Sequence, residues 1–269
     1  MLEERTALVA GEGLLPVVIA SRMTDEGNPP IVYSLRENIG ELSRYALDVV
    51  NIPKPDLGYT IKDMKNRGVK NIIMACMVSK TLAFKPRLLD LTSQRFLASL
   101  IFSDDHSLLG AIVSFLEKEG FKVLSYRSII SDLLAPKGHI AGRAPTQEEK
   151  DDAEYGFSIC KVLVPLSFGQ TVIVKKRSVV AVEAMEGTDA ALLRAGSLCT
   201  GGVVAKMLRL DQDERYDIPT VGPDTLRHMA QAKLKCLALH ADWTLILEPE
   251  EFRAVAKEKA LSVIGIDVC

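Results

Sequence analysis

The chain has 269 residues, which is enough to bury a large core and favours two domains over one. Its formal net charge of -2 is close to zero, so nothing in it indicates a nucleic-acid partner or a strongly anionic surface. No apolar run approaches the roughly 20 residues of a membrane-spanning helix, and the acidic start lacks the basic region of a signal peptide, so we expect a cytoplasmic protein.

Short apolar runs alternate with amphipathic ones through the first half of the sequence. The runs that predict strands are Thr6–Ala10, Pro30–Leu35, Val69–Val78 and Phe121–Tyr126, and the segments that predict helices are Leu14–Arg22, Ile39–Val50, Ile61–Asn66, Pro86–Phe102 and Asp104–Glu119. Strands that alternate with helices are typical of parallel β-α-β units. We therefore expect residues 1–134 to form a Rossmann-like domain with a parallel sheet.

A stretch rich in proline and glycine follows at Ala135–Pro145. Its two prolines and two glycines interrupt both helical and strand periodicity. Directly after it, Thr146 and Glu149 have the spacing of a capping box, which predicts the start of a helix. We therefore expect a linker over residues 135–147 and a C-terminal domain over residues 148–269.

The second half again mixes helices and strands, with more hairpin character. Predicted helices are Glu148–Leu163, Ala190–Ala195, Asp224–Lys235 and Glu250–Lys259, and predicted strands are Gln170–Val174, Ser178–Ala184, Gly202–Lys206, Cys236–Leu239, Thr244–Glu248 and Ser262–Ile266. The predicted fold is two α/β domains, the N-terminal one Rossmann-like with a parallel sheet and the C-terminal one with a mixed sheet, and a cleft between them.

The five cysteines are scattered and form no C-x-x-C pair. This distribution argues against both a disulfide framework and a structural zinc site, so we expect reduced thiols. Any bound metal is then expected to be a hard ion held by oxygen ligands.

Gly11 and Gly13 follow the first predicted strand and open the first helix. Glycines at such a turn let backbone amides approach a phosphate. Pro16 occupies the third glycine position of the dinucleotide fingerprint, so support for an NAD site is weak. A tight turn without a ligand is an equal alternative. Asp104 and Asp105 precede a predicted helix, where they either cap it or contact a substrate.

Glu186-Gly-Thr-Asp189 lies between a predicted strand and a predicted helix. Ligands collect at the carboxyl ends of strands in α/β sheets, and free amides near Gly187 suit a phosphate. Helix capping by Thr188 is the alternative. Next along the chain, Gly201 and Gly202 precede a strand that ends at Lys206, a combination that suits either phosphate binding or an ordinary turn.

The segment from Asp211 to Pro219 is the richest in charge. Alone it could be a solvated loop. Asp213 and Asp217 could instead supply the one or two carboxylates that Mg²⁺ commonly takes from a protein. Arg215 could offset charge that develops on a phosphate.

Taken together, these segments resemble the LpxI family, the Mg²⁺-dependent UDP-2,3-diacylglucosamine pyrophosphatases of lipid A synthesis. The residues that carry the resemblance are Val182–Asp189 with Arg194, Gly201-Gly202 with Lys206, Gln212–Gly222, Leu8–Pro16 and Asp104–Leu109. The resemblance runs nearly end to end.

The resemblance implies hydrolysis of UDP-2,3-diacylglucosamine to UMP and 2,3-diacylglucosamine 1-phosphate (lipid X). It implies Mg²⁺, with Mn²⁺ as a substitute, held by Asp217, Asp213, Asp189 and Glu186. The implied catalytic residues are Asp217, Asp213 and Arg215. The implied substrate-binding residues are Gly11, Gly13, Asp104, Asp105, Gly187, Thr188, Arg194, Gly201, Gly202, Lys206 and Gln212.

The implied partner is a UDP-linked diacylated lipid, and peripheral contact with the inner membrane and a homodimer are compatible with it. Lys80–Leu91 mixes basic and large apolar residues, so it could lie at the membrane or line an acyl channel, or form an ordinary core-facing helix. The alternative function is a non-catalytic nucleotide-sugar or lipid-binding protein, which would leave the carboxylates without a purpose.

Overall fold

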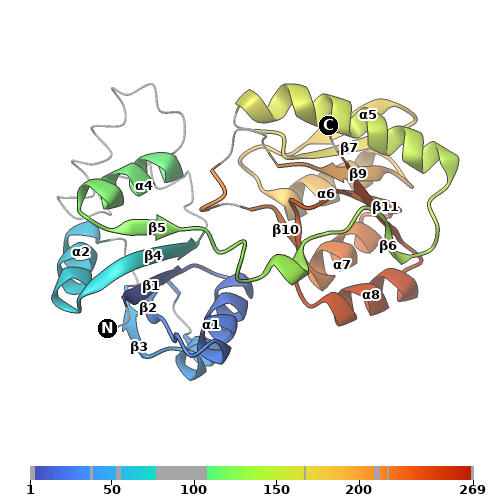
Figure 1. Ribbon diagram of the computed structural model, residues 1–269. Helices are drawn as coiled ribbons and strands as arrows, with labels where there is room; N and C mark the ends of the chain where they lie inside the picture. Colours follow the sequence, from blue (N-terminus) through green and yellow to red (C-terminus); the bar gives the residue numbers. More distant parts are fainter. Residues whose placement is uncertain are drawn as a thin grey trace. The chain divides into compact units, whose positions relative to one another are not determined.

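The computed structural model describes residues 4–36, 39–52, 56–76, 108–166, 168–208, 213–216 and 218–267 (Figure 1). The helix expected at Pro86–Phe102 and the segment Lys80–Leu91 lie outside these residues. The chain divides into two compact units. One comprises Met1–Ser131 together with Asp213–Asp217, and the other comprises Asp132–Gln212 together with Ile218–Cys269.

The first unit is built on a parallel sheet with the strand order β3-β2-β1-β4-β5. Its elements are β1 (Arg5–Ala10), α1 (Leu15–Asp25), β2 (Ile31–Ser34), η1 (Gly40–Arg44), β3 (Asp48–Asn51), α2 (Leu57–Asn66), β4 (Val69–Ala75), α4 (Leu108–Lys118) and β5 (Lys122–Leu124). This order, with β1 in the middle, confirms the expected Rossmann-like sheet.

The core of this sheet follows from strand alternation. Ala7 and Ile72 lie on the same face and are buried in one cluster with Met64 of α2 and Leu116 of α4. Tyr216 belongs to the same cluster, although it comes from the second half of the sequence. Helix α1 packs against β1 and β4.

The helix expected over Ile39–Val50 is wrong. The structure has the short 3-10 helix η1 there, followed by strand β3, which pairs in parallel with β2. The β-branched pair Val49-Val50 favours a strand, and its pairing partner lies elsewhere in the chain.

The second unit is built on a mixed sheet with the order β6-β13-β11-β9-β7-β8, as expected. Its elements are η4 (Ser131–Leu133), β6 (Gly138–Gly142), α5 (Gln147–Leu163), η5 (Val164–Leu166), β7 (Thr171–Lys175), β8 (Ser178–Val182), α6 (Thr188–Leu198), β9 (Val203–Lys206), β10 (Thr220–Val221), α7 (Pro223–Gln231), β11 (Cys236–His240), β12 (Leu245–Ile246), α8 (Pro249–Glu258) and β13 (Ser262–Ile266). Strands β10 and β12 form a separate parallel pair.

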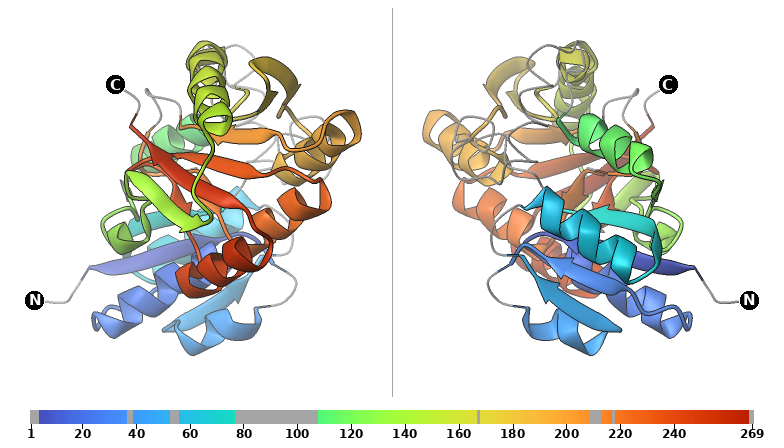
Figure 2. Two further views of the ribbon diagram at one scale, coloured as in Figure 1. Left: turned by 90° about the vertical axis from the view of Figure 1, so that its right-hand side faces the viewer. Right: turned by 90° about the vertical axis from the view of Figure 1, so that its left-hand side faces the viewer.

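Helices cover both faces of the mixed sheet, α5 on one and α6, α7 and α8 on the other (Figure 2). Val203 and Ala205 are buried in the cluster that includes Phe157 of α5. Val204, between them, is buried in the cluster that includes Leu226 of α7. By the same alternation, Lys206 shares the face of Val204.

The stretch expected to be an irregular linker contains strand β6, which pairs antiparallel with β13 at the edge of the sheet. Gly142 has φ 72°, and a Cβ there would lie 2.0 Å from the carbonyl oxygen of Leu261. Glycine therefore allows a close approach of two backbones at this position instead of ending a structure.

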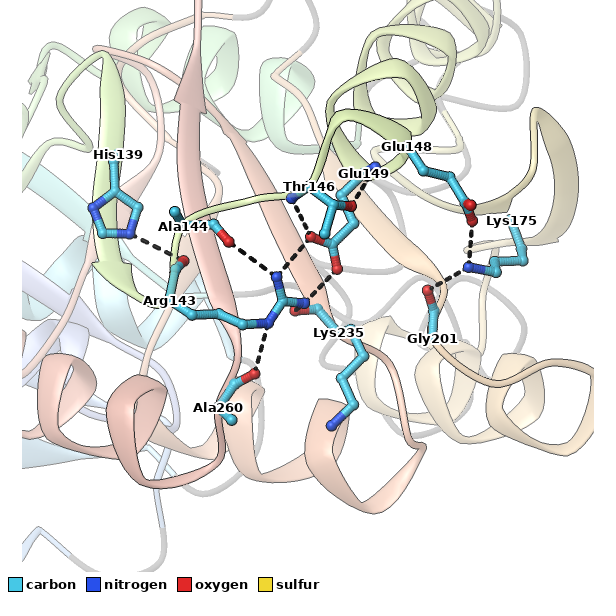
Figure 3. Close-up of polar contacts among 10 residues, drawn as sticks. All are labelled: His139, Arg143, Ala144, Thr146, Glu148, Glu149, Lys175, Gly201, Lys235 and Ala260. Carbon is cyan, nitrogen blue, oxygen red and sulfur yellow. Dashed lines mark hydrogen bonds and ion pairs between the residues drawn. The ribbon is translucent and has the colours of Figure 1, made fainter.

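Arg143, directly after β6, connects helix α5 to the turn that follows α8 through its guanidinium group (Figure 3). It forms two hydrogen bonds with the carboxylate of Glu149, one of them of 2.8 Å, and donates from Nε to the carbonyl oxygen of Ala260 at 3.1 Å. Glu149 also accepts from Thr146 N at 2.9 Å, and Glu149 N donates to Thr146 Oγ1 at 3.2 Å. This reciprocal pair confirms the predicted capping box and fixes the start of α5.

Replacing Glu149 by glutamine should destabilise the fold in a pH-dependent way. Burial raises the pKa of Glu149, but hydrogen bonds from Arg143 and Thr146 outweigh it, so its pKa lies below the ordinary value. A carboxylate with a depressed folded pKa stabilises the protein above its unfolded pKa of about 4.3, and this contribution is lost as pH falls through the folded pKa. We expect Glu149→Gln to lower the free energy of unfolding by about 2 kcal/mol at pH 7. The difference in unfolding free energy between wild type and variant should become smaller below about pH 4.

Urea unfolding at several pH values measures this effect. Glu148→Gln is the matched control, because Glu148 is exposed and forms a surface ion pair with Lys175 across 2.7 Å. An equal decrease in the free energy of unfolding in the two variants would contradict a special role for Glu149.

Candidate functional site

Lys206 is a buried lysine at the carboxyl end of β9, with 7% of its surface exposed. Its Nζ donates to Thr188 Oγ1 at 3.0 Å and to Thr171 Oγ1 at 3.4 Å. Thr171 is the residue opposite Lys206 in the antiparallel pairing of β7 with β9. Lys206 forms no ion pair with any described carboxylate, so both of its partners are neutral hydroxyl groups.

Glu183 extends this cluster just beyond the end of β8. Thr188 Oγ1 donates to Glu183 Oε1 at 2.9 Å, while Glu183 Oε2 is buried and accepts no hydrogen bond from the described residues. Hydrogen bonds thus connect Lys206 to Thr188 and Thr188 to Glu183 at the carboxyl edge of the sheet. Because a buried carboxylate oxygen without a partner is costly, Glu183 Oε2 is suited to a ligand that brings a hydrogen-bond donor or a cation.

Helix α6 begins at the same edge. Its N-cap is Gly187, with φ 82°, and no side chain caps its first amides. The hydroxyl of Thr188 is engaged with Lys206 and Glu183 and is not used as a cap. The first-turn N–H groups of α6 and the Lys206 ammonium group therefore offer positive charge to an anion at one edge of the sheet.

Glu186 and Arg194 are paired with each other. Arg194 Nη2 donates to Glu186 Oε1 at 2.5 Å and to the carbonyl oxygen of Val182 at 2.9 Å. Hydrogen bonds from its own backbone amide and from Arg194 lower the pKa of Glu186, so the carboxylate is ionised at neutral pH. Asp189 faces a different partner, His228 of α7, with 3.0 Å between Asp189 Oδ1 and His228 Nδ1.

The structure does not bring Gly201 and Gly202 near Lys206. They precede β9 at its amino end, whereas Lys206 stands at its carboxyl end. A Cβ on Gly202 would lie 3.1 Å from Leu234 Cδ2 and 3.2 Å from Cys199 Sγ, so packing accounts for this glycine. A role for the pair in substrate binding stays a prediction.

Asp213 and Arg215 lie in the first unit. Arg215 donates from Nε to both carboxylate oxygens of Asp213, at 2.8 and 2.9 Å, and from Nη1 to Glu117 Oε1. Hydrogen bonding from Arg215 lowers the pKa of Asp213, which is therefore ionised at neutral pH. Asp217, Gln212, Asp104 and Asp105 lie outside the described residues, so their predicted roles stay predictions.

The turn after β1 also belongs to the first unit. Gly11 N donates to the carbonyl oxygen of Ala75 at 3.0 Å, and Gly13 has φ 86° with open space around its Cβ position. No side chain caps α1, which starts directly after this turn. Arg36 was not among the predicted site residues. Its buried Nε lies 3.5 Å from Oε2 of Glu12, which is part of this turn.

No three His, Cys, Asp or Glu side chains gather into a metal-binding group among the residues that the structure describes. Glu186 and Asp213 are each neutralised by an arginine, which leaves them poor ligands in this arrangement. Magnesium, which commonly takes only one or two carboxylates from a protein, stays a prediction.

The fold and the site define a class: an α/β protein of two units, with a Rossmann-like first sheet and, at the carboxyl edge of its second sheet, a buried lysine and a helix N-terminus that no side chain caps. Residues 5–133 match the LpxI N-terminal domain and residues 136–264 match the LpxI C-terminal domain. The chain is 30% identical over 276 residues, which cover 98% of each protein, to the UDP-2,3-diacylglucosamine pyrophosphatase LpxI of Caulobacter vibrioides. It belongs to the LpxI family, which confirms the resemblance seen in the sequence.

Proposed function

We propose that this protein hydrolyses the diphosphate of UDP-2,3-diacylglucosamine to UMP and 2,3-diacylglucosamine 1-phosphate in lipid A biosynthesis, with Mg²⁺ as its cofactor. The relative from Caulobacter vibrioides bears the name of that activity, and the similarity covers both units. The structural observation that carries the proposal is the buried Lys206 beside the N-terminus of α6.

The chemistry of a diphosphate suits this site. Hydrolysis moves negative charge onto the leaving phosphate, and a buried cation stabilises that charge more strongly than an exposed one. The hydroxyl groups of Thr171 and Thr188 hold the Lys206 ammonium group in place. No carboxylate among the described residues pairs with it, so its charge is available to a phosphate.

Magnesium is the second part of the proposal, and the family resemblance supports it. The predicted ligands Glu186 and Asp213 are paired with arginines in this structure, and Asp189 Oδ1 lies 3.0 Å from His228 Nδ1. Mg²⁺ usually keeps several waters and takes one or two protein carboxylates together with substrate phosphates, so we assign no described residue to it.

Incubation with UDP-2,3-diacylglucosamine, followed by mass analysis, tests the function. We expect UMP and lipid X to form with Mg²⁺ and their formation to stop in excess EDTA. Binding of the substrate without product, with or without metal, would favour the alternative of a nucleotide-sugar or lipid-binding protein. Release of both products in EDTA would retain the hydrolysis and remove magnesium from the proposal.

The lipid substrate also requires access to a membrane. No helix in the described part of the chain is long and apolar enough to span one. We propose peripheral contact with the inner membrane, because two acyl chains keep the substrate in the bilayer. Flotation with vesicles of phosphatidylethanolamine and phosphatidylglycerol tests this, and absence of binding with and without substrate would exclude it.

A further inference from the structure

The segment Asp213–Tyr216 belongs to a different unit from the residues that flank it in the sequence. Residues on both sides of Asp213–Asp217 belong to the second unit, whereas this short segment belongs to the first. Tyr216 is 6% exposed and lies in the buried cluster that also contains Leu116 of α4 and Val123 of β5. A buried aromatic side chain fixes the segment on the first unit.

Hydrogen bonds and ion pairs add to this anchor. Ser125 Oγ, directly after β5, donates to the carbonyl oxygen of Glu214 at 2.8 Å, and Arg127 Nη1 lies 3.3 Å from Glu214 Oε2. Arg215 Nη1 donates to Glu117 Oε1 of α4 at 2.5 Å. Three consecutive residues of the segment therefore each contact the first unit.

Each of the three nitrogens of the Arg215 guanidinium group donates to a carboxylate. Nε and Nη2 donate to Asp213, and Nη1 donates to Glu117. Its charge is thus balanced by two carboxylates before any substrate binds. An arginine held by two carboxylates is suited to fixing geometry, because a planar fork binds them in defined directions.

We propose that Arg215 is a positioning residue, not a phosphate-binding one, and that it acts with Glu117 to fix the segment Asp213–Tyr216 on the first unit. This inference rests on the proposed function, since Asp217, which follows the segment in the sequence, is the predicted catalytic aspartate. Glu117 then supports hydrolysis through the contact of its carboxylate with Arg215. Nothing in the sequence pointed to Glu117, which lies on a helix far from this segment along the chain.

Glu117→Gln is the test, with Glu119→Gln as the matched control. Glu119 also carries a carboxylate near the end of α4, but it pairs with Lys65, across 2.5 Å, and not with the segment. We expect Glu117→Gln to lower kcat on the order of tenfold, because small displacements of a catalytic group are costly, while KM stays within about twofold. Glu119→Gln should keep the wild-type kcat.

A double-mutant cycle separates positioning from direct contact. Under the proposal, Glu117→Gln combined with Arg215→Gln loses little more kcat than Arg215→Gln alone, because both changes break one connection. Independent, additive losses would overturn the proposal. So would a wild-type kcat in Glu117→Gln, which would leave Arg215 to act on the phosphate directly.

Hydrogen exchange gives a readout that does not depend on turnover. We expect amides of residues 213–216 to exchange faster in Glu117→Gln than in wild type, with unchanged exchange in β1 and β4. Unchanged exchange at residues 213–216 would refute the proposal that Glu117 fixes this segment, even if the enzyme were active. If wild-type protein released no UMP, the proposed function would fail, and exchange alone would still decide whether Glu117 holds the segment.

Discussion

Replacing Lys206 by methionine should lower kcat/KM for UMP release by roughly 100- to 1,000-fold, the usual cost of removing one group that stabilises developing charge. Methionine has a similar length and fills the same space, so the fold should remain. Loss of the buried ammonium group removes a desolvation cost, and Tm should therefore not fall. The measurement is UMP release under saturating and limiting substrate, together with thermal unfolding.

Two further variants test whether the expected loss of activity is specific to the Lys206 ammonium group. Lys175→Met removes a lysine from the opposite edge of the same sheet, where Lys175 Nζ contacts Glu148 and the carbonyl oxygen of Gly201. We expect it to keep wild-type activity. Lys206→Arg keeps the charge in a larger group and should be intermediate. Equal losses in Lys175→Met and Lys206→Met would mean that general charge, and not this site, governs turnover.

Replacing Asp217 by asparagine should have the largest effect, a loss of at least about a thousandfold in kcat, as expected for an aspartate that activates the attacking water. The basis is the family resemblance, since Asp217 lies outside the described residues. Asp213→Asn is the informative comparison. Asp213 is held by Arg215, so its loss should weaken the anchor and lower kcat on the order of tenfold, as a positioning defect does.

Single-turnover measurements with both variants decide whether each aspartate has a catalytic or a positioning role. Circular dichroism and Tm check that each variant is folded. A folded Asp217→Asn variant that hydrolyses substrate at the wild-type rate would refute the assignment. A thousandfold loss in Asp213→Asn, with an unchanged exchange rate at residues 213–216, would place Asp213 among the catalytic groups.

The regular elements of the fold could be predicted because their signals are local. Strand β1, helix α5 and its capping box at Thr146 are readable from neighbouring residues. Strands β3 and β6 could not be read in this way, since both are short edge strands whose partners are β2 and β13. At β6 Gly142 looked like an interruption, whereas it permits a close backbone contact with Leu261 that only tertiary structure creates.

The candidate site was predictable only in part, for a similar reason. Lys206 and Thr188 were expected from their positions after strands, and the structure places them within hydrogen-bonding distance. Thr171 carries no local signal, because strand pairing brings it to Lys206. Glu183 lies within the motif Val182–Asp189, but the sequence assigned it no role. The charged residues were harder still: a sequence shows Asp213 and Arg215 as separate charges and does not show that they neutralise each other.

The position of Tyr216 also bears on how the chain folds during synthesis. When the ribosome has made residues 1–131, the apolar cluster of the first unit still lacks this side chain, which emerges only after much of the second unit. The first unit therefore completes its interior late, so its nascent form should be more open to proteases and chaperones than the finished protein. A chimera that exchanges N-terminal halves between relatives would need to exchange residues 213–217 with them.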